Sequence, residues 1–289
     1  MLGFREWARR GLVANRQPFQ ALERLGLHVM PVHWATPIPD TRELRARLDR
    51  WYRPSSLGGV DVDLPRQLEL LAELGRVEPL PLRYEELSAA GFGEGYEAID
   101  AEILWRMIRH VGPSLVVEVG AGLSTAVTSA ALGGTGKVVA IEPYPRPALE
   151  RLAGVDLVRE RAQDVGPEIF DRLGAGDVLF IDSSHYVSLG SDVPWLFLEV
   201  VPRLASGVLV HVHDIHLPYP IRDPHYVFAR HAFWNEVFLV QAFLQFNREF
   251  EILLAAAMVR HLAPDALGSA LPQFDGRLHA PSSLWLRRR

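Results

Sequence analysis

The sequence predicts an α/β fold in which a mostly parallel sheet is covered by helices on both faces. Short apolar runs alternate with helical segments from residue 91 onward, which is the pattern of strand–helix units in parallel sheets. The first of these runs ends in an acid and a glycine-rich turn, which is typical of the point where a strand passes into a helix. The expected strands are Leu115–Val119, Lys137–Ile141, Val155–Arg159, Val178–Ile181 and Val208–His213.

Helices and two closing strands are expected around this pattern. Ile99–His110 precedes the first strand as a helix, and Ala126–Leu132 follows that strand as another. After the fifth strand, Ala232–Asn247 carries apolar residues at helical spacing and predicts a long amphipathic helix. Two later apolar runs, Phe250–Ala257 and Ser283–Leu286, are candidates for the last strands of the sheet.

The chain is expected to divide near residue 90 into a helical extension, residues 1–90, and an α/β domain, residues 91–289. Helices are predicted in the extension at Thr41–Trp51 and at Pro65–Leu74, where the proline suits the first helical turn. Prolines and glycines between them indicate loops. The extension carries no recognisable chemistry, so we expect it to cover one side of the sheet. A substrate lid and an oligomer contact are the alternatives.

Composition excludes several classes of function. The formal net charge of −5 gives no bulk attraction to nucleic acid or to an anionic membrane. The lack of cysteine excludes disulfides, thiol catalysis and cysteine-ligated metals. No apolar run approaches the length of about 18 residues that a membrane span needs, and Met1–Arg10 has no apolar signal core. We therefore expect a cytoplasmic protein whose partner is a small molecule, with homo-oligomer formation left open.

The glycine-rich turn after the first strand is a candidate site for a nucleotide-containing cofactor. Gly120 and Gly122 can adopt backbone angles closed to other residues, which lets the main chain approach a ligand. Glu142 closes the second strand about 20 residues later, where an acid commonly hydrogen-bonds ribose hydroxyls. Together the two signals indicate that a nucleoside-containing cofactor binds here.

Two residues argue against a dinucleotide in this turn. The dinucleotide fingerprint has a third small residue three positions after Gly122, where this chain has Thr125. Glu118, two residues before Gly120, is unfavourable beside a pyrophosphate but suits a cofactor with a cationic, amine-bearing tail. An NAD(P)-dependent oxidoreductase using the same crevice stays as an alternative.

The pattern Glu118-x-Gly120-x-Gly122, followed by Glu142, resembles the class I S-adenosylmethionine-dependent methyltransferases. The resemblance implies a Rossmann-like fold with a seven-stranded sheet whose last strand inserts antiparallel, and S-adenosylmethionine as the cofactor. Glu142 is then expected to hold the ribose and Glu118 to organise the amine end. Gln163 and Asp164 are candidates for the adenine edge. The full set of candidate cofactor residues is Glu118, Gly120, Ala121, Gly122, Ser124, Thr125, Glu142, Gln163 and Asp164.

Acids and histidines follow the fourth and fifth strands. Asp182 and His185 come directly after the fourth strand, and His213 and Asp214 end the fifth. In a methyltransferase sheet these two strands are neighbours, so the resemblance implies that these side chains meet beside the methyl group of the cofactor. Such a set suits a hard divalent cation, a general base, or both. His211, inside the fifth strand, is expected to be a hydrogen-bonded core histidine.

A closer resemblance rests on Phe180–His185, Gly190–Val193 and Val212–Ile215. These segments resemble a bacterial methyltransferase family with an Asp-Ser-Ser-His motif. That family is related to cephalosporin hydroxylase-like proteins and similar to the metal-dependent O-methyltransferases of macrolide sugars. The resemblance implies that Asp182 is a metal ligand and part of the catalytic pair, that His185 is the catalytic base, and that His213 and Asp214 are further metal ligands.

His213 stands where the macrolide enzymes have a carboxylate, so a transition metal becomes more plausible relative to Mg²⁺. The resemblance implies an O-methyltransferase that acts on a hydroxyl of a sugar or small natural product with the help of a divalent metal. Asp192, seven residues after His185, is a candidate to orient its imidazole. The alternative from outside the enzymes is a degenerate methyltransferase fold that serves as a binding or assembly module.

Overall fold

The computed structural model describes residues 16–30, 32–33, 36–81 and 83–289. The chain forms two compact units. The smaller combines the described residues between Arg16 and Tyr52 with His225–Phe233, and the larger combines Arg53–Pro224 with Trp234–Arg289. The predicted division at residue 90 into an extension and a domain stays a prediction.

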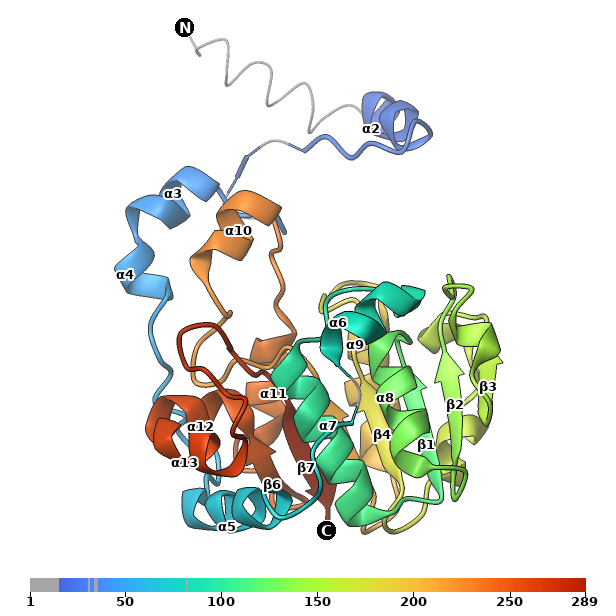
Figure 1. Ribbon diagram of the computed structural model, residues 1–289. Helices are drawn as coiled ribbons and strands as arrows, with labels where there is room; N and C mark the ends of the chain where they lie inside the picture. Colours follow the sequence, from blue (N-terminus) through green and yellow to red (C-terminus); the bar gives the residue numbers. More distant parts are fainter. Residues whose placement is uncertain (1–15, 31, 34–35, 82) are drawn as a thin grey trace, which may run out of the picture. The chain divides into compact units, whose positions relative to one another are not determined.

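A seven-stranded sheet in the order β3-β2-β1-β4-β5-β7-β6 forms the centre of the larger unit (Figure 1). The first five strands pair in parallel, and β7 is antiparallel to both of its neighbours. This is the arrangement that the resemblance implies, so the predicted fold class is confirmed. The strands are β1 (Leu115–Val119), β2 (Lys137–Ile141), β3 (Val155–Val158), β4 (Val178–Ile181), β5 (Leu209–Val212), β6 (Phe250–Ala255) and β7 (Leu284–Arg288).

Apart from Glu118 and His211, the central strands are apolar on both faces because helices cover both sides of the sheet. Every residue of β1, β4 and β5 is buried. Strands of a parallel sheet that are buried on both faces read as continuous Val/Ile/Leu runs, as these do. The register pairs Val119 with Ile181, and Ile181 with Val212. The residues that follow β1, β4 and β5 therefore emerge side by side at one edge of the sheet.

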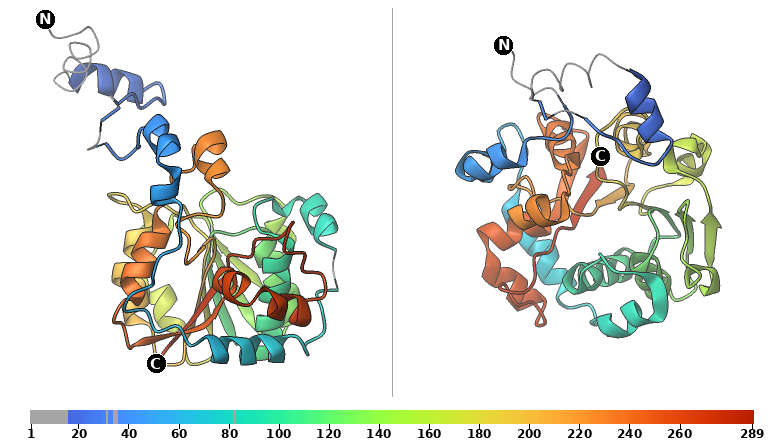
Figure 2. Two further views of the ribbon diagram at one scale, coloured as in Figure 1. Left: turned by 90° about the vertical axis from the view of Figure 1, so that its left-hand side faces the viewer. Right: turned by 90° about the horizontal axis from the view of Figure 1, so that it is seen from above.

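Figure 2 shows the sheet between its two layers of helices. One buried cluster joins the sheet to α5, α7, α8, α12 and α13, and the other joins it to η4, η5 and α11. The helices of the larger unit are α5 (Leu64–Leu74), α6 (Tyr84–Leu87), η1 (Ser88–Phe92), α7 (Ala98–Val111), α8 (Leu123–Leu132), η2 (Leu149–Arg151), η3 (Ala162–Asp164), η4 (Pro167–Arg172), α9 (Asp192–Trp195), η5 (Leu196–Val200), η6 (Val201–Arg203), α11 (Glu236–Leu244), α12 (Ala256–Leu262) and α13 (Pro264–Ala270).

The largest departures from the predicted elements lie in the last third of the chain. The predicted strand Phe250–Ala257 is two residues too long, because β6 ends at Ala255 and α12 begins at Ala256. Alanine has the highest intrinsic helix propensity, which favours this change of structure within an alanine run. The predicted helix Ala232–Asn247 is shorter at both ends, since α11 covers only Glu236–Leu244.

The smaller unit contains α2 (Arg16–Glu23), α3 (Thr41–Ala46) and α4 (Leu48–Trp51), together with most of α10 (Pro224–Arg230). The predicted helix Thr41–Trp51 is interrupted at Arg47, whose φ of −127° and ψ of 37° are not helical. Within this unit the ring of Phe228 lies 6.2 Å from that of Trp51, edge to face. Across the described part of the chain, no helix has the length and apolar character needed to cross a membrane.

Candidate functional site

A pocket of about 490 Å³ opens at the ends of β1, β2 and β4. Its lining includes four predicted site residues, namely Gly120, Glu142, Gln163 and Asp182. The volume lies in the range of about 300–1,000 Å³ that is usual for small-molecule and cofactor sites. The structure therefore brings the predicted ribose acid, the glycine turn and the first acid of the second motif into one cavity.

The glycine turn touches the end of β4. A Cβ atom placed on Gly120 would lie 1.8 Å from the backbone oxygen of Asp182, and the φ of Gly120 is +81°. Only glycine can occupy this position without a backbone clash. The Gly120 N–H donates to the Ile141 carbonyl over 3.0 Å, which ties the turn to the end of β2 as well.

Glu142 is half-buried and is held by backbone N–H groups. Its carboxylate accepts from the N–H of Tyr144 over 2.8 Å and from that of Ala121 over 3.4 Å. Because Ala121 belongs to the glycine turn, Glu142 links the ends of β1 and β2 while its carboxylate lines the pocket. This position suits a contact with a ribose.

Several other predicted cofactor residues lie outside the lining of the pocket, namely Glu118, Ala121, Gly122, Ser124, Thr125 and Asp164. Ser124 Oγ donates to Glu118 Oε1 over 2.5 Å, and Thr125 Oγ1 accepts from the Gly122 N–H over 3.0 Å. These two hydroxyls therefore stabilise the turn from within. Asp164 is exposed in η3, one residue beyond Gln163.

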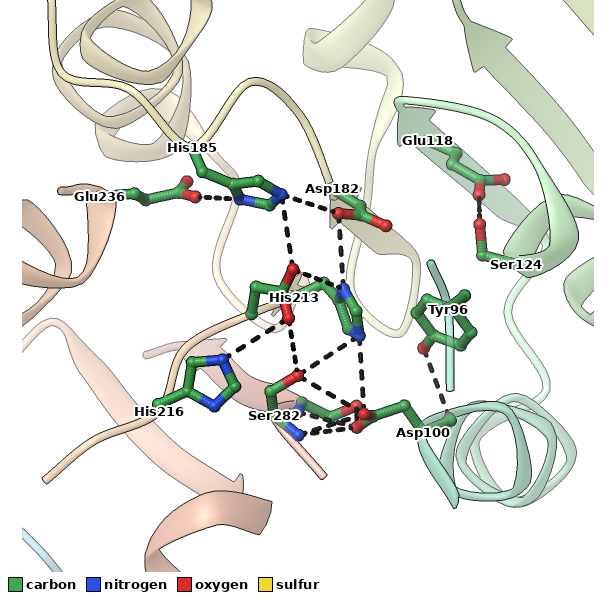
Figure 3. Close-up of polar contacts among 12 residues, drawn as sticks. Tyr96, Asp100, Glu118, Ser124, Asp182, His185, His213, His216, Glu236 and Ser282 are labelled. Atoms are coloured by element: carbon green, nitrogen blue, oxygen red, sulfur yellow. Dashed lines mark hydrogen bonds and ion pairs between the residues drawn. The ribbon is translucent and has the colours of Figure 1, made fainter. Parts of the chain in front are cut away.

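Glu118 is fully buried behind the glycine turn (Figure 3). Burial raises the pKa of its carboxyl to about 8, because the charged form loses its solvation. Its Oε2 atom has no hydrogen-bond partner among the described residues. A buried acid with an unused oxygen can accept a hydrogen bond from a cationic amine that reaches it, as the sequence predicts for Glu118.

A second cluster lies at the ends of β4 and β5 (Figure 3). Ligand atoms of Asp182, His185 and Asp214 all lie within 4.8 Å of one another, which makes these residues a possible metal-binding group. His185 Nε2 is 3.4 Å from Asp182 Oδ1 and 3.7 Å from Asp214 Oδ2. The predicted convergence of the two strand ends is therefore present.

His213 lies beside this converging group but is not one of its members. The converging group contains His185 in place of His213 as its nitrogen donor. The His213 imidazole is 1% exposed, with Nδ1 at 3.4 Å from Asp182 Oδ1 and Nε2 at 3.6 Å from Asp100 Oδ2. His213 Nδ1 also lies 3.8 Å from Asp214 Oδ2, so its imidazole contacts three carboxylates, and its charge can be shared among them as ion pairs.

Asp100, on α7, is a site residue that the sequence analysis missed. It is fully buried, and its carboxylate accepts from the N–H groups of Ser282 and Ser283 and from Ser283 Oγ, the last over 2.5 Å. These contacts join α7 to the residues just before β7. The available signal was an acid within the predicted helix Ile99–His110, at a position where a purely structural helix buries an apolar residue.

Glu236, the first residue of α11, is the second residue that was missed. Its Oε2 lies 2.9 Å from His185 Nδ1 (Figure 3). Asp192, the predicted partner of His185, instead accepts from the Ser184 N–H over 2.9 Å and from Ser184 Oγ over 2.5 Å. The hypothesis that Asp192 orients the imidazole is therefore wrong. Glu236 is the one ionisable residue of α11, and this feature of the sequence could have identified it as a site residue.

The cluster favours bound positive charge. Burial alone would raise the pKa of Asp182, but the charges and hydrogen bonds of His213 and His185 bring it well below its usual value. Burial would likewise raise the pKa of Asp214, yet His213 and His216 hold it at about 2. Conversely, hydrogen bonds to Asp182 and Glu236 outweigh burial and raise the pKa of His185 to about 10. The carboxylates of such a site stabilise positive charge, which is present either as protonated imidazoles or as a bound cation.

His185 and Asp214 also share an unusual backbone conformation. Their φ angles are +62° and +55°, in the left-handed region that side chains other than glycine seldom occupy. Residues held in this region cluster at functional sites, where the surrounding structure enforces them. Both residues therefore owe their orientation to contacts from neighbouring elements.

His211 is buried, as predicted, but it is not hydrogen-bonded. Its ring stacks on Phe180 at 4.3 Å and meets Trp285 at 4.7 Å. Neither ring nitrogen has a hydrogen-bond partner among the described residues. Burial lowers the pKa of His211 to about 3, so the ring is neutral and acts as an aromatic core residue.

Comparison with known proteins supports the assignment of the fold. Residues 117–215 match the model of a family described as a methyltransferase domain. The matched stretch runs from β1 to just beyond β5 and includes both the pocket and the acid–histidine cluster. An uncharacterized protein of Archaeoglobus fulgidus is 27% identical over 161 residues, which cover 50% of this chain and 72% of that protein.

Solved structures similar to the chain include two O-methyltransferases. One is from Bacillus cereus in complex with SAH, with a TM-score of 0.44 and 14% identity over 79% of this chain and 94% of that chain. The other is TomG from Streptomyces achromogenes, involved in tomaymycin synthesis, in complex with SAM. It has a TM-score of 0.42 and 17% identity over 79% of this chain and 91% of that chain.

The strand order is that of the predicted class I methyltransferase fold, and residues 117–215 at its centre match the methyltransferase-domain family. The S-adenosylmethionine-dependent methyltransferase predicted from Glu118-x-Gly120-x-Gly122 and Glu142 is confirmed at this level.

Proposed function

We propose that the chain transfers a methyl group from S-adenosylmethionine to a hydroxyl oxygen of a sugar or small natural product. The observation that carries this proposal is that Asp182 belongs to both parts of the site. It lines the cofactor-sized pocket together with Gly120 and Glu142, and it is also a member of the acid–histidine cluster. A methyl donor in the pocket and a hydroxyl at the cluster would therefore lie beside one another.

The pocket residues fit this cofactor. Glu142 would accept hydrogen bonds from the ribose hydroxyls, and Gly120 lines the same pocket. Gln163 would meet the adenine edge. The unpartnered Oε2 of Glu118 would accept from the amine end, since the buried acid can lose its proton when a cation is near. When bound, S-adenosylmethionine supplies an electrophilic methyl group.

Asp182 and Asp214 would hold a divalent cation at the cluster. Two carboxylates suit Mg²⁺ or a similar ion, whose remaining positions are commonly filled by water and substrate oxygens. A cation there would lower the pKa of a hydroxyl that binds it. His213 is already paired with Asp100, so we assign it the role of holding Asp182 in place.

In the form that carries no proton on Nε2, His185 would accept the proton of the acceptor hydroxyl. Its Nδ1 is engaged by Glu236, which leaves Nε2 facing the cluster. A hydroxyl is a poor nucleophile while protonated, and a positioned base contributes roughly 10²–10⁴ in rate. The remaining rate enhancement would come from holding the oxygen close to the methyl group and in line with it.

The test is a transfer assay with methyl-labelled S-adenosylmethionine and a panel of glycosides and small hydroxylated compounds. We expect the label in a methyl ether, and we expect His185→Ala and His185→Gln to lower kcat by roughly 10²–10⁴ while cofactor affinity stays the same. Transfer to nitrogen or sulfur acceptors alone would contradict O-methylation. A kcat for His185→Ala above about a tenth of wild type would contradict the role of the base.

A further inference from the structure

We infer that Asn235 and Glu236 form a cradle that sets the conformation of His185, with Glu236 as the positioning residue for its imidazole. The inference rests on the proposed role of His185 as the base. Neither cradle residue lies in the segment that matches the methyltransferase family, residues 117–215. They belong to the start of α11, about 50 residues beyond His185.

The first part of the cradle holds the backbone. The carbonyl of His185 accepts from the N–H of Asn235 over 3.1 Å and from the N–H of Glu236 over 3.3 Å. The side-chain oxygen of Asn235 accepts from the Val187 N–H over 2.6 Å. Three hydrogen bonds therefore fix the loop after β4, and they account for the left-handed φ of +62° at His185.

The second part holds the ring. Glu236 Oε2 lies 2.9 Å from Nδ1, and because an ionised carboxylate can only accept, Glu236 in that form places a hydrogen on Nδ1. The proton stays on Nδ1 whatever the state of Nε2, so Nε2 is always the atom that faces Asp182 and Asp214. Trp234 packs its ring 4.8 Å from the imidazole at 50°, which restricts rotation of the ring. The ring thus has one productive orientation.

The burial of Glu236 supports a positioning role over simple packing. Glu236 is 2% exposed, and its Oε1 has no hydrogen-bond partner among the described residues. Burying a carboxylate is unfavourable unless a partner compensates for it. The other buried residues of α11, Val237, Val240 and Leu244, are apolar and already attach the helix to the core. The contact with His185 is therefore the contribution that distinguishes Glu236 from the apolar residues of α11.

The first experiment detects the contact between Glu236 and His185 directly and does not depend on an activity assay. In protein labelled with ¹⁵N in the histidine rings, NMR should show a Nδ1–H of His185 that is protected from solvent exchange, assigned by its loss in His185→Gln. We expect the signal to persist in Glu236→Gln, whose amide oxygen still accepts, and to vanish in Glu236→Ala. Phe238→Ala, an exposed position two residues along the same helix, is the matched control and should keep the signal. A signal unchanged in Glu236→Ala overturns the inference.

The second experiment separates positioning from folding. Glu236→Ala should lower kcat roughly 10–100-fold at unchanged cofactor affinity, and Glu236→Gln should restore most of the loss. Asn235→Ala is the independent variant if Glu236→Ala fails to fold, and it should speed amide exchange at Val187. Equal kcat in all these variants and wild type overturns the inference. If the NMR result holds while His185→Ala is fully active, the cradle exists and the proposed base is wrong.

Discussion

Gly120 and Asp182 are in backbone contact: a Cβ atom on Gly120 would stand 1.8 Å from the carbonyl oxygen of Asp182. Gly120 follows β1 and Asp182 follows β4, two neighbouring parallel strands in which Val119 pairs with Ile181. The cofactor turn and the acid cluster are therefore fixed by the same pair of strands. This contact brings the glycine turn and Asp182 together in the lining of one pocket.

Replacement of Gly120 by alanine should abolish binding of S-adenosylmethionine. The new Cβ would displace the end of β4, and the φ of +81° adds strain. Gly134→Ala is the matched control, since its φ is +86° and a Cβ there would meet open space. Thermal unfolding and calorimetric titration of both variants separate the clash from the strain. Indistinguishable behaviour of the two variants would show that the contact is unimportant.

Loss of Asp100 should destabilise the fold. Asp100→Ala removes the acceptor for Ser282 and Ser283 and leaves His213 without one of its three neighbouring acids. Breaking a buried ion pair in this way costs about 3–5 kcal/mol, which urea unfolding can measure. The exposed Asp156, on β3, gives a control variant that should change stability little. A cost below about 1 kcal/mol for Asp100→Ala would mean that the pair is not formed.

Glu118 should make stability fall as pH rises. Burial raises its folded-state pKa from 4.5 to about 8, so the unfolded chain releases the proton first. Between about pH 4.5 and 8 the folded state binds more protons than the unfolded state, and its stability decreases with pH. Glu118→Gln removes this term, so its stability relative to wild type should improve steadily from pH 5 to 8. Parallel stability curves over that interval would contradict the raised pKa.

Much of this arrangement was predictable because the signals are local. The apolar runs ending in Glu118, Glu142 and Asp182 gave the strands and the order of the motifs, since parallel strands must expose their functional residues at the carboxyl end. The antiparallel β7 came from the family resemblance, because Leu284–Arg288 alone carries no sign of its direction.

The parts that were missed depend on distant segments. Glu236 reaches His185 across 51 positions, and Asp100 reaches the residues before β7 across 182. No local pattern encodes such pairings. His213 was assigned to the metal from the family resemblance, and no local pattern shows that its imidazole also meets an acid on α7. Its Nε2 lies 3.6 Å from Asp100 Oδ2, while its Nδ1 lies 3.4 Å from Asp182 Oδ1 and 3.8 Å from Asp214 Oδ2.

Chelation should lower activity, and a divalent ion should restore it. Direct titration of the chelated protein with Mn²⁺ gives a readout that does not need an acceptor. Asp214→Asn should weaken binding of the ion at least about tenfold, because it removes a charged donor. Asp192→Asn is the control, since this acid lines the same pocket but lies outside the converging group. Full turnover after exhaustive chelation, with no Mn²⁺ binding, would eliminate the metal from the account.

The most direct test is calorimetric titration of S-adenosylmethionine into wild type and Glu142→Ala, with NADH and NADPH titrated in parallel. The account predicts micromolar binding of S-adenosylmethionine, about 7–8 kcal/mol, and no binding of the nicotinamide cofactors. Glu142→Ala should weaken the binding by roughly 1.5–3 kcal/mol, while Glu150→Ala, an exposed acid nearby, should leave it unchanged. An unaltered affinity in Glu142→Ala, or preferential binding of a nicotinamide cofactor, would contradict the assignment of the pocket.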